Sequence, residues 1–274
     1  MSIIESAFLK NKKEQSHNKN KNTPDDIGDI VGRADQDGMI SSNKIVSAKE
    51  NIAKMKQKRL YSQEELAELG FISKATTDTK LINEYRNLRT KLVEYAGQKN
   101  FVTLVTSVSA NFNASMVIAN LAATLALDEG KTSLVINADI NNSEIDNIFG
   151  IEPKFGLVDF IRSSDVALDE IIYETPINRL RYIPVGLNIE SSAEHFSDAR
   201  MKETIASVLE RYPERYIFIN APSISQSADT RILLGTSDKV ILVVPYGKAT
   251  EDGIRQAVLS IGKEKLAGIV LNEF

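Results

Sequence analysis

The sequence contains no cysteine and only two histidines among its 274 residues. The absence of cysteine excludes a disulfide framework and a thiolate metal site. His17 and His195 are isolated from each other and from other metal-ligating residue types. Such histidines are typical of surface or capping positions, so the sequence does not predict a histidine-based metal centre.

Long apolar runs and a basic surplus are also missing. No run approaches the roughly 20 residues of a membrane-spanning helix, and the first residues lack the basic and apolar regions of a secretory signal. The formal net charge is -4. A general nucleic-acid-binding role is not expected, because binding to the phosphate backbone normally requires a basic surface. These absences favour a cytoplasmic protein.

Charge and composition change near residue 60. Residues 1–60 have a net charge of +4, whereas the remainder has a net charge of -8. The stretch 11–26 is polar, rich in Lys and Asn, and has too little apolar surface to fold by burial. We therefore predict a largely disordered extension over 1–60, with a short amphipathic helix over 3–9 as a local option. A flexible tail and a docking segment both remain open as its role.

Residues 61–100 predict a helical lead-in to the main domain. Ser62 and Glu65 have the spacing of a capping box, in which each side chain bonds to the backbone of the other residue. A second helix is expected over 81–96, where apolar residues recur at helical spacing. Gly97 is a natural end for that helix, because glycine readily adopts the left-handed backbone conformation.

Residues 101–274 alternate between apolar strands and helices. Strands are expected at 101–107, 133–137, 181–185, 216–220, 239–244 and 266–271, and helices at 115–129, 199–212 and 250–263, the first ended by Gly130. Continuous apolar strands that alternate with helices indicate an α/β fold, with a mainly parallel sheet and helices on both faces. Ligands of such three-layer folds bind at the carboxyl ends of the strands.

The first of these strands leads through a short polar loop into a helix. This arrangement favours an anion, because free backbone N–H groups and the helix dipole point the same way. A functional phosphate loop ends in Gly-Lys-Ser or Gly-Lys-Thr. Here the corresponding triplet is Asn113-Ala114-Ser115, which by itself indicates no more than a turn between a strand and a helix.

Further short motifs occur along the chain in a fixed order. They are Ser2-Ile3-Ile4-Glu5, Tyr85-Arg86-Asn87-Leu88-Arg89, Val105-Thr106-Ser107, Asn120-Leu121-Ala122, Ile136-Asn137-Ala138-Asp139, Gly156-Leu157-Val158-Asp159, Pro184-Val185-Gly186, Arg211-Tyr212-Pro213-Glu214-Arg215, Phe218-Ile219-Asn220-Ala221-Pro222 and Val270-Leu271-Asn272. In this order the chain resembles the bacterial tyrosine autokinases of exopolysaccharide and capsule clusters, especially their exosortase-associated branch. The resemblance covers nearly the whole chain and implies a P-loop NTPase-like domain over 101–274.

The resemblance also implies a site for ATP and Mg²⁺. The residues that would surround the nucleotide are Ser107, Asn111, Asn113, Ala114, Ser115, Met116, Asp139 and Asn272. Ser115 and Asp139 would be the remaining metal ligands. Arg86 and Arg89 match the helix through which relatives associate, although Asn83 stands at its acidic position.

The departures from the family pattern bear on activity. Ala114 replaces the catalytic lysine, Asn137 and Asn220 replace two aspartates, and Asn111 and Asn113 replace two glycines. The chain thereby loses one cation for the phosphates and two anions for Mg²⁺. Losing two or three charged hydrogen bonds, or on the order of 5 kcal/mol, weakens a micromolar affinity to roughly millimolar. We therefore expect no active catalytic residue, no bound cofactor and no metal.

The interpretation that follows is a catalytically degenerate scaffold or regulator of exopolysaccharide or capsule biosynthesis or export. By resemblance, its partner would be a membrane polysaccharide chain-length-determinant protein or an active sister kinase, which would hold it at the inner face of the membrane. A homo-oligomer is a further option. One alternative is a divergent ATP-binding tyrosine kinase or ATPase with a displaced lysine such as Lys131. Another is a positioning ATPase that shares this fold.

Overall fold

The computed structural model describes residues 61–97, 99–109, 112, 114–128, 130–163, 165–186, 196 and 199–273, together with residues 52 and 55. The chain divides into two units, residues 1–47 and 48–274, and the fold below is that of the second unit. Some predictions fall on residues outside the described ones: nearly all of the disordered extension, the helix over 3–9, the two histidines, and the loop positions Asn111 and Asn113.

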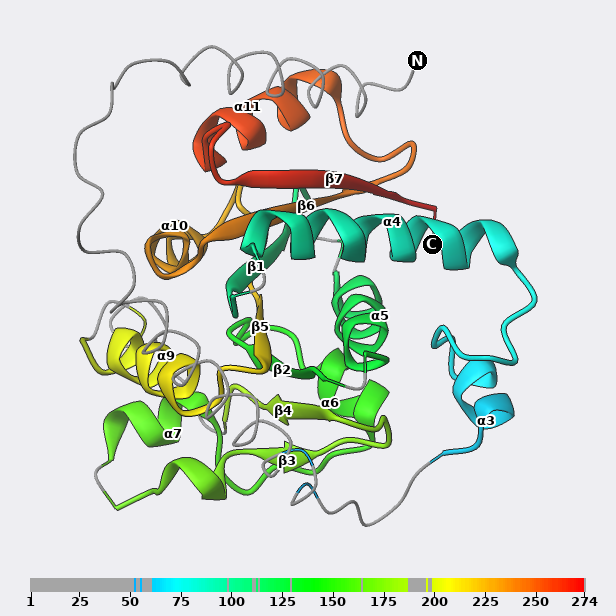
Figure 1. The fold of residues 1–274 in the computed structure, drawn as a ribbon. Coiled ribbons are helices and arrows are strands. Elements are labelled where there is room, and N and C mark those ends of the chain that lie inside the picture. Colours follow the sequence, from blue (N-terminus) through cyan, green and yellow to red (C-terminus); the bar gives the residue numbers. More distant parts are fainter. Residues whose placement is uncertain are drawn as a thin grey trace, which may run out of the picture. The chain divides into compact units, whose positions relative to one another are not determined.

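A seven-stranded sheet forms the centre of the second unit (Figure 1). Its strands are β1 (Val102–Ser107), β2 (Thr132–Asn137), β3 (Tyr173–Glu174), β4 (Leu180–Ile183), β5 (Arg215–Asn220), β6 (Lys239–Pro245) and β7 (Leu266–Asn272). They lie in the order β3-β4-β2-β5-β1-β6-β7, and only β3 runs antiparallel to its neighbour. The predicted α/β class with a mainly parallel sheet is confirmed.

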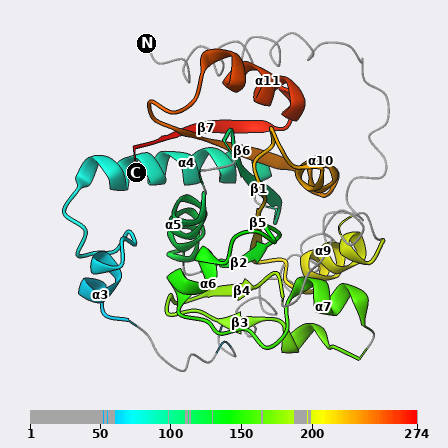
Figure 2. The ribbon, with the colours of Figure 1, turned by 180° about the vertical axis from the view of Figure 1, so that it is seen from behind.

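Helices cover both faces of the sheet (Figures 1 and 2). The helices are α3 (Gln63–Glu68), α4 (Thr79–Ala96), α5 (Ser115–Ala126), α6 (Glu144–Phe149), α7 (Leu157–Arg162), α9 (Ala199–Arg211), α10 (Ala228–Leu233) and α11 (Glu251–Ile261), with short 3₁₀ helices η1 (Leu168–Glu170) and η2 (Leu234–Thr236). Helices α3 to α6 share one buried core with the sheet, and α7, α9, α10 and α11 share the other. Within the described part of the chain, no helix combines the length and apolarity needed to cross a membrane.

The strands alternate between these two cores. Val135 of β2 and Phe218 of β5 face α5, whereas Leu134 and Ile217 face the opposite core. Both sets are fully buried, which explains why the strands read as continuous apolar runs. Because side chains alternate along a strand, the last residues of β2 and β5 also face the α5 side.

The helical lead-in matches its predicted signals. Ser62 caps α3, its hydroxyl accepts from the N–H of Glu65, and the Glu65 carboxylate accepts from the N–H of Ser62. Helix α4 ends at Gly97 with a φ of 55°, as predicted. It begins two residues before the predicted start, because the Asp78 carboxylate caps it by accepting from the N–H of Leu81 at 3.0 Å.

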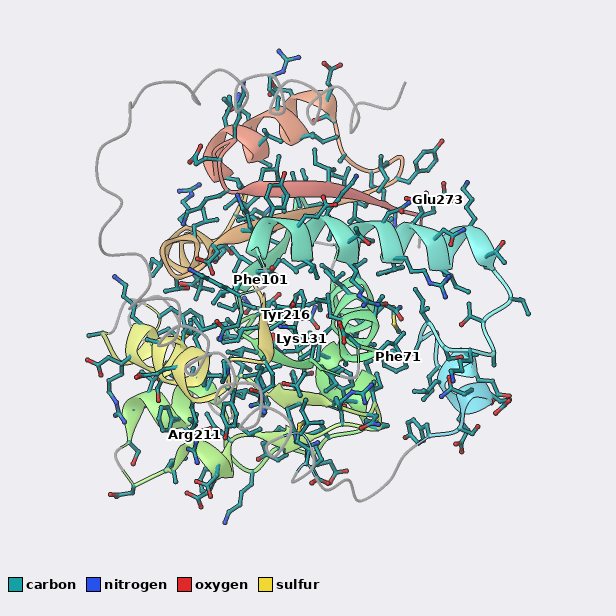
Figure 3. All side chains as sticks on the ribbon, in the orientation of Figure 1. Phe71, Phe101, Lys131, Arg211, Tyr216 and Glu273 are labelled. Carbon is teal, nitrogen blue, oxygen red and sulfur yellow. The ribbon has the colours of Figure 1, made fainter. Side chains whose placement is uncertain are left out.

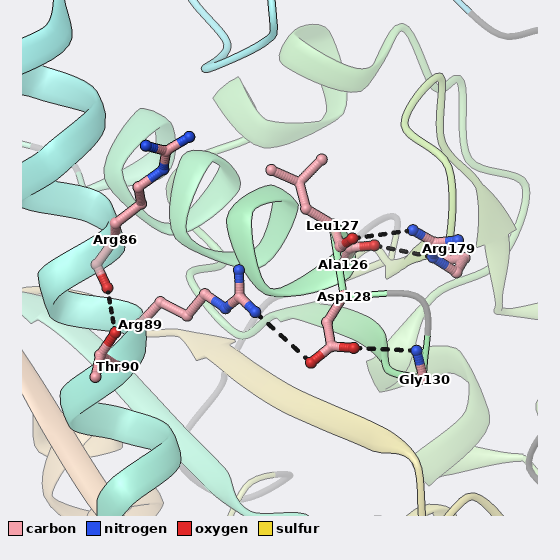
Figure 4. Close-up of polar contacts among 8 residues, drawn as sticks. All are labelled: Arg86, Arg89, Thr90, Ala126, Leu127, Asp128, Gly130 and Arg179. Carbon is pink, nitrogen blue, oxygen red and sulfur yellow. Dashed lines mark hydrogen bonds and ion pairs between the residues drawn. The ribbon is translucent and has the colours of Figure 1, made fainter.

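The end of α5 differs from the prediction. The helix stops at Ala126 rather than at residue 129, and Gly130 is not its cap. Arg179 is the reason, since its guanidinium donates to the carbonyl oxygens of Ala126 at 2.9 Å and Leu127 at 3.3 Å (Figure 4). A side chain from another part of the chain therefore satisfies the terminal carbonyls, and neighbouring sequence gives no sign of it.

Several short elements were not predicted, among them α6, α7, α10 and β3. Six-residue helices are too short to show a full hydrophobic period, which leaves them without a sequence signal. The Gly156-Leu157-Val158-Asp159 motif forms the start of α7. A side chain at Gly156 would come within 2.3 Å of the backbone nitrogen of Gly186, so close packing of two backbones explains this glycine.

Candidate functional site: a neutral crevice at the strand ends

A cavity of about 460 Å³ lies at the carboxyl ends of β1, β2 and β5. Its walls come from the loops that follow these strands, from the first turn of α5 and from α10. The described residues that line it are Ser107, Phe112, Ala114, Asp139, Asn141, Asn142, Asn220, Ala221, Pro222, Ser223, Gln226, Ser227, Ala228 and Asp229. This is the position at which parallel α/β sheets bind ligands.

The structure brings most of the predicted nucleotide-site residues to this cavity. Ser107, Ala114, Asp139 and Asn220 line it directly. Ser115 is the first residue of α5 and is fully buried.

Two predicted residues lie elsewhere. The side chain of Met116 lies beside Gly70, in the segment that follows α3. Asn272 ends the edge strand β7, where its carbonyl accepts from the N–H of Tyr246 at 2.8 Å. Neither is among the described residues that line the cavity. Their role as neighbours of a nucleotide therefore stays a prediction, with the side chain of Met116 packed toward the α3 segment and Asn272 on the edge strand.

Asn137 and Asn220 form a buried amide pair at the base of the crevice. They are register partners on β2 and β5, and the side-chain Nδ2 of Asn220 donates to Oδ1 of Asn137 at 3.0 Å. Their exposed fractions are 0% and 2%. Two carboxylates at this separation would repel each other unless a cation lay between them. Two amides instead satisfy each other without a metal.

The first turn of α5 offers no positively charged side chain. Ala114 precedes the helix, makes no side-chain capping bond and is 4% exposed. Its carbonyl accepts from the N–H of Ile118 at 2.9 Å, which starts the helix. This turn therefore offers an anion its backbone N–H groups and the helix dipole, without a cationic side chain.

The ionisable side chains of the cavity are both acidic. Asp139 and Asp229 line it, and no Lys, Arg or His occurs among the described lining residues. Burial raises the pKa of Asp139, a backbone hydrogen bond from Asn141 opposes this rise, and the charge of Asp229 adds to it. Two carboxylates without a neighbouring cation disfavour a phosphate group in this cavity.

The loop after β1 is held by hydroxyl groups. The Ser107 hydroxyl donates to the carbonyl of Ser109 at 2.8 Å, and the Thr106 hydroxyl donates to the carbonyl of Pro222 at 2.5 Å. The Ser225 hydroxyl donates to the carbonyl of Val108 at 2.8 Å. The Thr-Ser sequence thus joins the end of β1 to the loop after β5.

The predicted association residues lie on α4 (Figure 4). Arg89 forms an ion pair with Asp128, with 3.6 Å between its guanidinium nitrogen and the carboxylate. The backbone carbonyl of Arg86 accepts from the Thr90 hydroxyl at 2.9 Å, and the side chain of Arg86 is exposed. Arg89 therefore has a partner within the chain, while Arg86 remains available to solvent.

Lys131, labelled beside Tyr216 in Figure 3, precedes the amino end of β2, whereas the cavity lies at the carboxyl ends of the strands. It immediately precedes β2, and its ammonium group is 5.2 Å from the centre of the Tyr216 ring. Asn137 ends the same strand, so roughly 20 Å of extended backbone separate the two residues. The hypothesis that Lys131 serves the crevice is wrong.

The Asn120-Leu121-Ala122 motif has a structural explanation. The side chain of Asn120 accepts from the N–H of Ile72 at 2.7 Å and donates to the carbonyl of Gly70 at 3.0 Å. It also bonds to Tyr85, whose pKa burial raises to about 12. This amide therefore fixes the lead-in against α5.

Two further residues that matter for the crevice had no sequence signal. Asp146 of α6 accepts a very short hydrogen bond from the hydroxyl of Tyr182 on β4. Both are buried, and Tyr182 lies opposite Val135, two residues before Asn137 on β2. The short helix α6 and the weakly patterned β4 gave no indication that these side chains would meet next to β2.

Similar proteins were found at the level of sequence. No protein-family model matches the chain. It is 26% identical over 211 residues to tyrosine-protein kinase CpsD of Streptococcus agalactiae serotype III, covering 76% of this chain and 89% of that protein. It is 27% identical over 205 residues to the tyrosine-protein kinase EpsB of Ralstonia nicotianae, covering 73% of this chain. This chain is a relative of the bacterial tyrosine-protein kinases.

The match to EpsB involves only 27% of that longer protein. Solved structures agree in fold. The kinase domain of Escherichia coli tyrosine kinase ETK superposes with a TM-score of 0.64 at 18% identity, covering 80% of this chain and 84% of that domain. The septum site-determining protein MinD of Pyrococcus horikoshii, solved with Mg-ADP, has a TM-score of 0.53 at 19% identity, covering 64% and 71%. The fold is therefore that of the P-loop NTPases.

Proposed function

We propose that this chain is a non-catalytic member of the tyrosine-kinase group that acts as a scaffold or regulator of exopolysaccharide or capsule biosynthesis or export. The amide pair of Asn137 and Asn220 carries the proposal. In an enzyme that transfers phosphate, these strand ends need charge to hold Mg²⁺. Here they are neutral and bonded to each other.

The remaining groups do not fit Mg-ATP either. Ala114 supplies no cation at the start of α5, and the charged side chains that line the described cavity are Asp139 and Asp229. A nucleotide triphosphate would bring further negative charge into a site without a basic side chain. The exchange of charged for neutral groups at positions 114, 137 and 220 therefore supports the loss of phosphoryl transfer.

The partner that we propose is a membrane polysaccharide chain-length-determinant protein or an active sister kinase. The supporting observation is that the tyrosine-kinase fold is retained although its charged centre is not. A chain that keeps the fold but lacks these charges is expected to act through its outer surface rather than through the crevice. The proposal predicts that deleting this chain changes polysaccharide output, while a variant with Ala at positions 139 and 229 does not.

Nucleotide titration tests the proposed loss of nucleotide binding and phosphoryl transfer. Calorimetric titration with ATP or ADP, with and without Mg²⁺, should give no binding below roughly millimolar concentration, because two or three charged hydrogen bonds are missing. Incubation with ATP should give neither hydrolysis nor phosphotyrosine above background. Mg²⁺-dependent turnover that Asp139→Asn abolishes, and that the exposed control Asp252→Asn leaves intact, would refute the proposal.

A further inference from the structure

The two edges of the sheet are built differently. Strand β3 forms one edge with two residues, one of which is the charged Glu174. Strand β7 forms the other edge with seven residues, Leu266–Asn272, and none of them is charged (Figures 1 and 2). Short edge strands and charged edge residues hinder pairing with other chains. The β3 edge has both of these protections, whereas β7 has neither.

The backbone of β7 is bonded on one side only in the described part of the chain. Its strand neighbour there is β6, and the pairing from Gly268 to Asn272 has no bulge. The carbonyl of Asn272 accepts from the N–H of Tyr246, just after β6, at 2.8 Å. Backbone groups of successive strand residues point to opposite sides, so those of Ile269 and Leu271 point away from β6. They form a row of donors and acceptors that an added strand can use.

The side chains beside this open edge are apolar. Leu271 is 56% exposed, although its register partner Val244 is buried. Ile269 is half-buried on the same face, where it packs against the core that the sheet shares with α11. Val270 is half-buried on the opposite face, against the core shared with α4. Tyr246, at the same end of the sheet, is 65% exposed. Two large apolar side chains therefore remain exposed at one end of the open edge.

These features fit a second copy of the same strand. When two β7 strands run antiparallel about a two-fold axis at Val270, the outward groups of Ile269 in one copy meet those of Leu271 in the other. The axis repeats this pair, and each pair exchanges both of its backbone hydrogen bonds. The exposed Leu271 then packs beside Ile269 of the second copy on one face of the joined sheet. A foreign strand would have to supply its own apolar residue there, whereas a second copy brings Ile269 by symmetry.

We propose that β7 is an association edge, at which two copies of this chain join their sheets antiparallel about a two-fold axis at Val270. The proposal goes beyond the proposed function, because it concerns the edge of the sheet and not the crevice, and its test needs neither nucleotide nor polysaccharide. It also differs from the association that the sequence suggests through Arg86 and Arg89, since both lie on α4. The dimer would present every partner-binding surface twice.

Sedimentation velocity of the whole chain tests the association. At roughly 100 μM the parent should sediment as a dimer and dissociate on dilution, as expected for a small interface of micromolar affinity. Leu271→Lys should weaken the dimer by about tenfold or more, because it places a charge on the paired edge. Leu127→Lys is the matched control, since Leu127 is 55% exposed and its carbonyl accepts from Arg179 next to β4. It should leave the dimer unchanged, and both variants should keep the parent Tm within about 2 °C.

A single cysteine tests the register. The chain has no cysteine of its own. The two-fold axis places Val270 opposite Val270 of the second copy, with about 4.5 Å between their Cα atoms, which a disulfide can bridge. Val270→Cys should therefore form a covalent dimer under mild oxidation, whereas Leu127→Cys should not at the same concentration.

Three results would each overturn the proposal. The first is a parent that stays monomeric at that concentration. The second is a dimer that Leu271→Lys leaves as stable as the parent dimer. The third is a dimer that Val270→Cys does not cross-link, which would exclude antiparallel pairing of two β7 strands in this register.

Discussion

The two ends of the central sheet bury different kinds of polar side chain. At the carboxyl ends of β2 and β5, the paired residues are the amides Asn137 and Asn220. At the amino ends of β4 and β5, the chain buries the charges of Arg181, Glu214 and Arg215, which are 8%, 3% and 4% exposed. The paired strand-end residues beside the crevice are thus neutral, whereas the buried side chains at the opposite end are charged.

The charges at the amino end are embedded in packing contacts. The guanidinium of Arg215 lies 3.9 Å from the centre of the Tyr212 ring and donates to the Thr132 hydroxyl at 3.4 Å. The guanidinium of Arg181 lies 3.5 Å from the carboxylate of Glu174. Burial raises the pKa of Glu214, and the charges of Arg215 and Lys131 oppose that rise. None of these groups is among the described residues that line the cavity.

The comparison teaches that buried charge persists where the fold depends on it. At the crevice, charged groups would serve to bind a metal and a nucleotide. Once such binding is no longer needed, neutral residues can replace them without the loss of a contact that holds the fold. At the amino end, removal of an arginine would leave a buried carboxylate without a cation that now acts on it. Three predictions test this contrast, beginning with the largest effect.

Arg215→Ala should lower the free energy of unfolding by about 3–5 kcal/mol, because it removes a cation whose charge acts on the buried Glu214 and opens space beside Tyr212. Urea denaturation measures the change. The exposed Arg231→Ala is the matched control and should remain within about 0.5 kcal/mol of the parent. A loss below about 1 kcal/mol for Arg215→Ala would mean that the amino end tolerates neutralisation as well as the crevice does.

Glu214→Gln should raise the free energy of unfolding at pH 7 by about 1 kcal/mol, because neither carboxylate oxygen of Glu214 has a hydrogen-bond partner in the described structure and an amide costs less to bury. The pKa of Glu214 is raised in the folded state. The contribution of protonated Glu214 to stability is therefore fully present below the pKa of the unfolded state. It is lost as the pH rises through the pKa of the folded state. The gain in the variant should appear at pH 7 and vanish near pH 4. Equal gains at both values would exclude ionisation of Glu214 as the cause.

Arg89→Ala should have the smallest effect, a loss below about 0.5 kcal/mol, because its ion pair with Asp128 is partly exposed. The same substitution at Arg86, which is exposed, serves as the control. Analytical ultracentrifugation of both variants also examines the association helix that the sequence suggests. Dissociation of an oligomer by Arg86→Ala but not by Arg89→Ala would assign that role to Arg86 alone.

The sequence predicted most of the sheet because each strand is apolar on both sides. The first and second strands, ending at Ser107 and Asn137, were predicted to the correct last residue. The short helices α6, α7 and α10 escaped prediction, since six residues give no clear periodicity. The end of α5 was also misplaced, because the guanidinium of Arg179 that satisfies its last carbonyls comes from about 50 residues away in the chain.

By itself, the sequence determined which charges are absent from the crevice. Ala114, Asn137 and Asn220 are neutral in any fold, and their order along apolar strands was enough to expect one crevice at the strand ends. Only the tertiary structure decided what the amides do. The pairing of Asn137 with Asn220 depends on strand register, and the bond from Tyr182 to Asp146 depends on the position of α6. Hydrogen bonds between side chains from distant segments are set by geometry, which composition and spacing do not contain.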